Sequence, residues 1–169
     1  DVARSDLLWI RMTRLPGHCV TRVALGSLFF QLLISLASGA TYTCVTGAQR
    51  DFNTSASWTP AGVPGSADTI IIATNCDIVI KAATGYSVGV HALQINAGQL
   101  TANSPLTVTQ SLTFSGGTLL GSSSTTLASG STATVNPTST STATLNAHRL
   151  LNHGTLSFVG PGSPAIRSL

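Results

Sequence analysis

The residues that could act as acids or bases are few, and they lie apart in the sequence. After residue 40 the carboxylates are Asp51, Asp68 and Asp77, and the chain contains no glutamate. A glycoside hydrolase holds two carboxyl groups on either side of one sugar bond, and the spacing of Asp68 and Asp77 does not position such a pair. Asp77 lies beside Cys76 and near Lys81, which is typical of a solvated charge at a sheet edge. We therefore assign no catalytic residue and favour a protein that is not an enzyme.

The histidines do not form a better candidate site. His148 and His153 are close in sequence but have no third donor nearby, so corners of the fold suit them better than a metal site. Serines are abundant, but no Gly-x-Ser-x-Gly elbow accompanies them. A serine close to a histidine such as His91 is therefore no evidence for a catalytic triad. The sequence predicts neither a metal nor a cofactor.

Two cysteines and one asparagine are candidates for covalent modification. Cys44 and Cys76 form an even pair that we expect to be bridged in an oxidising compartment, the alternative being two small buried side chains. Closing this loop of about 33 residues would stabilise the fold by ~3.7 kcal/mol in the chain-entropy model. Asn53-Thr54-Ser55 is the one acceptable N-glycosylation sequon.

The N-terminal part has the three features of a secretory signal peptide. Arg14 and Arg22 precede the apolar run 23–36, and the small residues Ser38 and Ala40 follow it. We expect cleavage after Ala40. The alternative is a membrane anchor, but the apolar run is shorter than the roughly 20 residues that a membrane span requires.

These features predict three regions. Residues 1–40 are a leader and signal peptide, with Met12 as a candidate translation start. Residues 41–67 are an N-terminal cap and lead-in segment, and residues 68–169 are repeated coils that we expect to be truncated at the C-terminus.

The composition excludes two classes of protein. With 43% hydrophobic residues the chain is too apolar for a disordered polar tail. The net charge is +3, but no charged residue occurs between Lys81 and Arg149. A nucleic-acid binder needs clustered cations, so nucleic acid is excluded as a partner.

After residue 40 the chain is predicted to be all-β. Helix-favouring residues are scarce, β-branched residues are abundant, and glycine or proline interrupts the sequence every few residues. Apolar and hydroxyl residues alternate, as in Leu106-Thr-Val108 and Leu112-Thr-Phe114. The expected strands are Thr69–Ile72, Ile78–Lys81, Ala92–Asn96, Leu106–Thr109, Ser111–Ser115 and Thr118–Leu120.

The expected strands also repeat. Residues 93–100 align with residues 112–119 at an offset of 19, with leucine and glycine at matching positions. Residues 151–158 look like a third copy, at an offset of 37 from Phe114. A strand, a turn glycine and another strand in each period favour a parallel β-solenoid. The alternative fold is an antiparallel β-sandwich. The Ser/Thr tract 122–144 is interpreted as degenerate coils rather than as an O-glycosylated linker.

One segment resembles a known family. The stretch 58–72, WTPAGVPGSADTIII, followed by Leu-x-Ile-x-x-Gly-x-Leu units, resembles the opening of secreted right-handed parallel β-helix proteins, among them pectin-lyase-like ectodomains, haemagglutinin-type adhesins and some hyaluronan-related surface proteins. The resemblance covers about residues 58–120 and, more weakly, 145–158. It implies that Trp58, Pro64 and Asp68 form an N-terminal cap. Polysaccharide-cleaving members of this family use carboxylates, often with calcium, together with a basic residue.

Three functions remain open at this point. The favoured one is a non-catalytic structural or adhesive β-helix protein, secreted or on the cell surface, of which this chain is the N-terminal part. The alternatives are a polysaccharide-active enzyme whose catalytic coils lie beyond Leu169, and a carbohydrate-binding module that uses Trp58, Tyr86 and surface hydroxyls. The expected partners are extracellular polysaccharides or other surface proteins, and the membrane is involved only through the export signal.

Overall fold

The computed structural model describes residues 39–161 and 165–167, and these form one all-β unit. The predicted leader, Met12 and the apolar run of the signal peptide lie outside the described residues. Among the residues that are described, no helix is long and apolar enough to cross a membrane.

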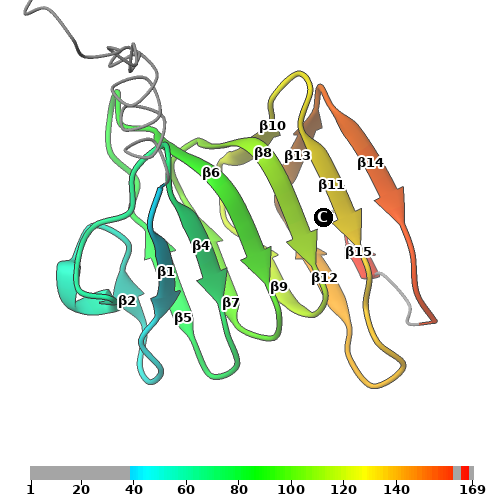
Figure 1. Ribbon diagram of the computed structural model, residues 1–169, viewed down its shortest axis with the longest axis horizontal. Helices are drawn as coiled ribbons and strands as arrows, with labels where there is room; N and C mark the ends of the chain where they lie inside the picture. The colour runs from blue at the N-terminus through cyan, green and yellow to red at the C-terminus, as the bar shows by residue number, and fades with distance from the viewer. Residues whose placement is uncertain (1–38, 162–164, 168–169) are drawn as a thin grey trace, which may run out of the picture. The chain divides into compact units, whose positions relative to one another are not determined.

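The strands lie side by side in two sheets (Figure 1). The first sheet contains β1 (Thr41–Cys44), β3 (Trp58–Thr59), β4 (Thr69–Ile72), β6 (Val88–Ile95), β8 (Leu106–Phe114), β10 (Ser124–Leu127), β11 (Thr132–Val135), β13 (Arg149–Asn152) and β14 (Thr155–Phe158). The second contains β2 (Arg50–Asp51), β5 (Asp77–Ile80), β7 (Gln99–Ala102), β9 (Gly117–Leu120), β12 (Ala143–Asn146) and β15 (Ala165–Arg167). A short 3₁₀ helix spans Ser55–Ser57.

The chain winds from the first sheet to the second and back, so that each coil lies beside the one before it. In the described part, every strand pair is parallel except β1 with β3. The parallel β-solenoid is therefore confirmed, and the antiparallel sandwich is wrong. The tract 122–144 holds β10, β11 and the first two residues of β12, so its interpretation as coils is also confirmed.

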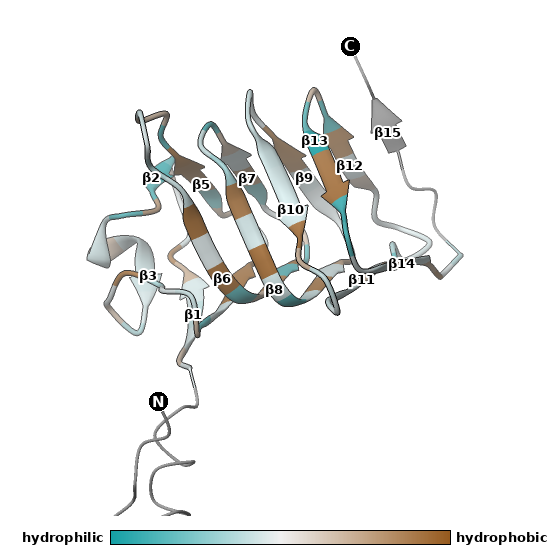
Figure 2. Cartoon of the chain, turned by 90° about the horizontal axis from the view of Figure 1, so that it is seen from above, coloured by the Kyte–Doolittle hydropathy of each residue, from teal (hydrophilic) through white to brown (hydrophobic). Residues whose placement is uncertain are grey.

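Apolar side chains stack in ladders inside the coils. Leu93 pairs with Leu112, and Leu100 pairs with Leu119 on the other sheet, which is the predicted offset of 19. These four leucines are 1–2% exposed. Apolar and polar residues alternate along β6 and β8 (Figure 2) because successive side chains of a strand point to opposite faces.

The repeated glycine has a physical reason. Gly117 has a φ of +85°, and a Cβ built on it would lie 2.2 Å from the carbonyl oxygen of Gly98, the equivalent residue of the preceding coil. A side chain at this corner would push neighbouring coils apart. The fixed offset of the glycines therefore reflects close approach of backbone to backbone.

The predicted third copy is wrong in its register. Leu156 was expected to be equivalent to Leu119, but it pairs with Ala133, which pairs with Leu112. Leu151 pairs with Thr126. The long turn between β11 and β12 contains residues that a fixed period does not allow for. The repeat therefore matched Leu156, which lies in the first sheet, with Leu119, which lies in the second.

Candidate functional site

Trp58 closes the N-terminal end of the described coils. It is 2% exposed, its indole N–H donates to the carbonyl of Phe52 at 2.8 Å, and the two rings meet edge to face at 5.2 Å. Its strand β3 pairs antiparallel with β1, with Cys44 opposite Trp58. A large apolar side chain thus covers the end of the core, and its one polar atom is satisfied.

Asp68 and Pro64 hold the turn that leads into β4. The two carboxylate oxygens of Asp68 each accept one backbone N–H, from Ala40 and from Gly65, both at 2.7 Å. Pro64 is buried beside this turn. Asp68 therefore ties the start of β1 to the start of β4.

Cys44 and Cys76 are joined by a disulfide, with S–S 2.04 Å and Cα–Cα 6.1 Å. Both are buried, Cys44 at the end of β1 and Cys76 directly before β5. The bridge connects the first coil to the second.

Each of the other two carboxylates also has a partner. Asp51 forms an ion pair with Lys81, with 2.8 Å between Oδ2 of Asp51 and Nζ of Lys81. Hydrogen bonds from Lys81 and from the backbone N–H of Asn53 lower the pKa of Asp51. Asp77 accepts a hydrogen bond from Gln99 at 3.2 Å, its register partner on β7.

Asp68 and Asp77, the two carboxylates considered as a catalytic pair, lie on separate elements. Asp68 lies in the turn before β4, whereas Asp51 and Asp77 lie on neighbouring strands of the second sheet. Within the described ranges, no three metal-ligating side chains come together.

The two histidines considered as a metal pair lie in different surroundings. His148 is buried before β13, with Nε2 2.9 Å from the Thr125 hydroxyl and Nδ1 3.3 Å from the Gly121 carbonyl. Burial lowers the pKa of His148, and the hydrogen bond to Gly121 opposes this shift. His153 follows β13 and is exposed. His148 therefore bridges two coils as an internal polar contact.

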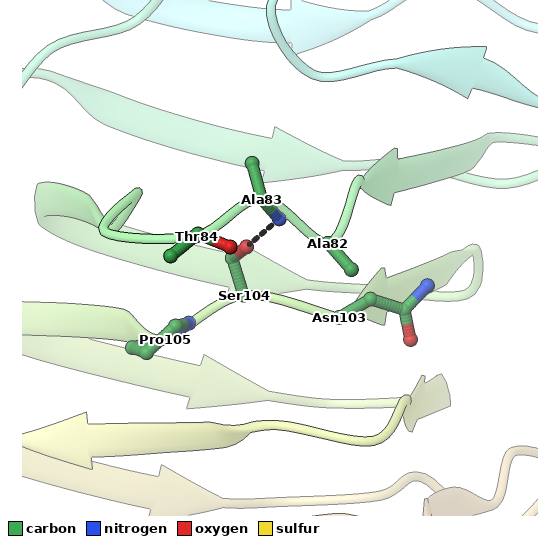
Figure 3. A pocket seen from close by; sticks show the side chains of 6 residues that line it. All are labelled: Ala82, Ala83, Thr84, Asn103, Ser104 and Pro105. Carbon is green, nitrogen blue, oxygen red and sulfur yellow. Dashed lines mark hydrogen bonds between the residues drawn. The ribbon is translucent and has the colours of Figure 1, made fainter.

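A shallow groove of about 330 Å³ lies between the turns that precede β6 and β8 (Figure 3). Its most buried polar side chain, Ser104, accepts the backbone N–H of Ala83 at 3.2 Å and donates to the carbonyl of Lys81 at 2.8 Å. No charged side chain lines the groove. Ser104 therefore holds the two turns together.

An array of hydroxyl groups lies on the outer side of β8, β11 and β14, and we call it the hydroxyl face. One column pairs Ser111 with Thr132 and Thr132 with Thr155. The second column pairs Thr113 with Thr134 and Thr134 with Ser157. All six side chains are exposed or half-buried, while Leu112 and Ala133 between them are buried.

The hydroxyl face is regular, and its two columns contain no charged residue. Neighbouring strands lie about 4.8 Å apart, and alternate residues of a strand lie about 6.6 Å apart. None of the six hydroxyls forms a hydrogen bond within the described residues. The array ends at β6, where Ala92 and Gln94 occupy the two columns.

Sequence reasoning missed the hydroxyl face. The signal was the Ser/Thr-x-Ser/Thr pattern at 111–113, 132–134 and 155–157, but such patterns recur throughout this chain. Only the strand register distinguishes those that stack. Comparisons with family models, with curated proteins and with solved structures found no match to the chain.

Proposed function

We propose that this protein is a non-catalytic, secreted or cell-surface β-helix that adheres to a neutral, ordered polysaccharide through its hydroxyl face. The observation that carries the proposal is the array of six aligned hydroxyls with no partner in the described part of the chain. The resemblance of residues 58–120 to pectin-lyase-like and adhesin-type β-helix proteins supports the same reading.

The chemistry of the hydroxyl face indicates a neutral ligand. Each threonine presents a hydroxyl, which both donates and accepts, next to a methyl group. No lysine, arginine or aspartate stands in the two columns. Sulfated or uronic-acid polymers would find no cation to pair with, whereas the hydroxyls of a neutral polysaccharide find matching partners.

The regularity of the face indicates a ligand that is already ordered. A flexible oligosaccharide loses conformational freedom when it binds, and a few hydroxyl contacts offset that loss poorly. The surface of an insoluble polysaccharide such as cellulose or chitin has its chains fixed beforehand. Many weak hydroxyl contacts between such a surface and the rigid sheet of the protein can then sum to stable binding.

The state of the carboxylates supports adhesion over cleavage. Asp68 accepts two backbone N–H groups, and Asp51 is engaged with Lys81. A nucleophile or general base needs a carboxylate that is free to reach the substrate. A lyase or hydrolase would therefore have to use groups other than these.

The test is a sedimentation assay of the full chain with insoluble cellulose and chitin. The informative variant is Thr132→Val with Thr134→Val, because valine keeps the β-branched shape and removes only the hydroxyl. The matched control is Thr118→Val with Thr144→Val, a register pair on the outer side of the second sheet.

We expect the hydroxyl-face variant to lose most of its binding and the control to keep it. Binding should change little between low and high salt because no ion pairs are involved. Equal binding by the two variants would refute the assignment of the face. Binding that disappears at high salt would refute the neutral ligand.

A further inference from the structure

Asn53 lies in an exposed turn between β2 and the 3₁₀ helix Ser55–Ser57. The carboxylate of Asp51 accepts the backbone N–H of Asn53 at 2.9 Å, and the carbonyl of Asp51 accepts that of Thr54 at 3.1 Å. The ion pair with Lys81 holds Asp51 in turn. The backbone of this sequon is therefore fixed at the surface.

The side chain of Asn53 is oriented by a residue from a later coil. The hydroxyl of Tyr86, in the loop between β5 and β6, donates to Oδ1 of Asn53 at 2.6 Å. Nδ2 of Asn53 forms no hydrogen bond within the described residues. The amide thus keeps its oxygen engaged with the hydroxyl of the half-buried Tyr86, whereas its nitrogen, the atom that a glycan modifies, is without a hydrogen bond in the described part of the chain.

We propose that Asn53 carries an N-linked glycan and that its first sugar packs on the ring of Tyr86. This inference rests on the export half of the proposed function, because the oligosaccharide donor is met in the secretory pathway. In the reaction a bond forms between Nδ2 of Asn53 and the anomeric carbon of a lipid-diphosphate oligosaccharide. The bond from that carbon to the diphosphate oxygen breaks, the lipid diphosphate leaves, and the amide proton passes to a base of the transferase.

The position of Tyr86 explains why the sugar should pack there. The hydrogen bond to Oδ1 holds the phenol of Tyr86 at the amide of Asn53, and the ring is partly exposed, so that it can offer apolar surface to the C–H groups of a sugar attached there. The glycan would then cover the corner where the cap segment meets the loop before β6. That contact would join two parts of the chain 33 residues apart.

The experiment expresses the full chain in a eukaryotic secretory host and compares the cell and medium fractions. Treatment with peptide N-glycosidase should increase gel mobility and convert Asn53 to aspartate in the mass spectrum. Ser55→Ala removes the sequon but keeps the bond between Asn53 and Tyr86, so it should abolish the shift. Thr54→Ala changes the middle residue of the sequon and should leave the shift intact.

Nitration tests the packing on Tyr86, with Tyr42 as the internal reference. Tyr86 should be nitrated several-fold more slowly in the glycosylated protein than in Ser55→Ala, after normalisation to Tyr42. Equal rates would overturn the packing. A secreted chain without glycan would overturn the modification while leaving export standing. A chain retained in the cell without glycan would overturn export, and this inference with it.

Discussion

Two adjacent leucines of β9 give a sharp test of the packing in the coils. Leu119 points inward, is 1% exposed, and is paired with Leu100 in the preceding coil and Leu145 in the next. Leu120 points outward and is half-buried. The two side chains share a chemistry, a strand and a backbone environment, so their truncation to alanine isolates the effect of burial.

We expect Leu119→Ala to lower the free energy of unfolding by about 3–4 kcal/mol. Truncation of a buried leucine costs about 2–5 kcal/mol, and more where neighbours cannot close the cavity. Here both register neighbours are fixed by backbone ladders on either side, which limits collapse. Leu120→Ala should cost about 1 kcal/mol or less, because its side chain is already partly in contact with water.

Urea unfolding of the secreted protein followed by circular dichroism measures both values. Its expected mature part, residues 41–169, contains Trp58 but not Trp9, so tryptophan fluorescence provides a second probe at the N-terminal end. Because coils can unfold in sequence, the two probes need not coincide. The comparison therefore uses the difference between variants for each probe. Equal losses, or a larger loss for Leu120→Ala, would refute the assigned register of β9.

Four further outcomes follow from the contacts described above. In the secreted protein, Cys44 and Cys76 should react with an alkylating reagent only after reduction, and reduction should lower the free energy of unfolding by up to ~3.7 kcal/mol. Labelling of both cysteines before reduction would contradict the bridge. The same protein should begin at Thr41, and an N-terminal sequence that starts within the apolar run would contradict the cleavage site. Burial lowers the pKa of His148, so the contribution of the neutral His148 to stability should be intact above the ordinary pKa of 6.5 and be lost as the pH falls below that value through the folded-state pKa. His148→Gln should flatten this pH dependence in thermal unfolding. An unchanged pH profile in the variant would contradict the role of His148. Asp68→Asn should cost about 1–3 kcal/mol in the same measurement, because the amide offers one acceptor oxygen where the carboxylate serves two N–H groups; no loss would mean that the turn holds without it.

The sequence predicted those parts of the fold where the coils are regular. The ladder of Leu93 with Leu112 and the paired glycines Gly98 and Gly117 follow directly from a repeat of constant length. The repeat failed beyond β10, because turn length is set by local backbone geometry and leaves no periodic trace: Thr125 of β10 lies 19 residues after its partner in β8, but Thr132 of β11 lies 21 residues after its partner there. The antiparallel strand β3 escaped notice for a related reason, since a strand of two residues shows no alternation.

The candidate site was harder to predict than the fold. The partners of Asp68 are backbone N–H groups, one of them 28 residues away, and no pattern of side chains signals such a contact. The hydroxyl face depends on which Ser/Thr pairs stack, which is a property of the register. The contact between Asn53 and Tyr86 crosses 33 residues and likewise has no local signal.

The 19-residue register between β6 and β8 makes the length of the molecule adjustable. Ala92 pairs with Ser111 and Leu93 with Leu112, so residues 19 apart occupy the same position in two successive coils. Excision of residues 92–110 would join His91 to Ser111 in an unbroken strand, with each ladder shortened by one rung. Insertion of the same interval would lengthen each ladder by one rung. The distance from the Trp58 cap to the hydroxyl face can therefore change in steps of about 4.8 Å, one strand spacing at a time, while the cap and the face stay as they are.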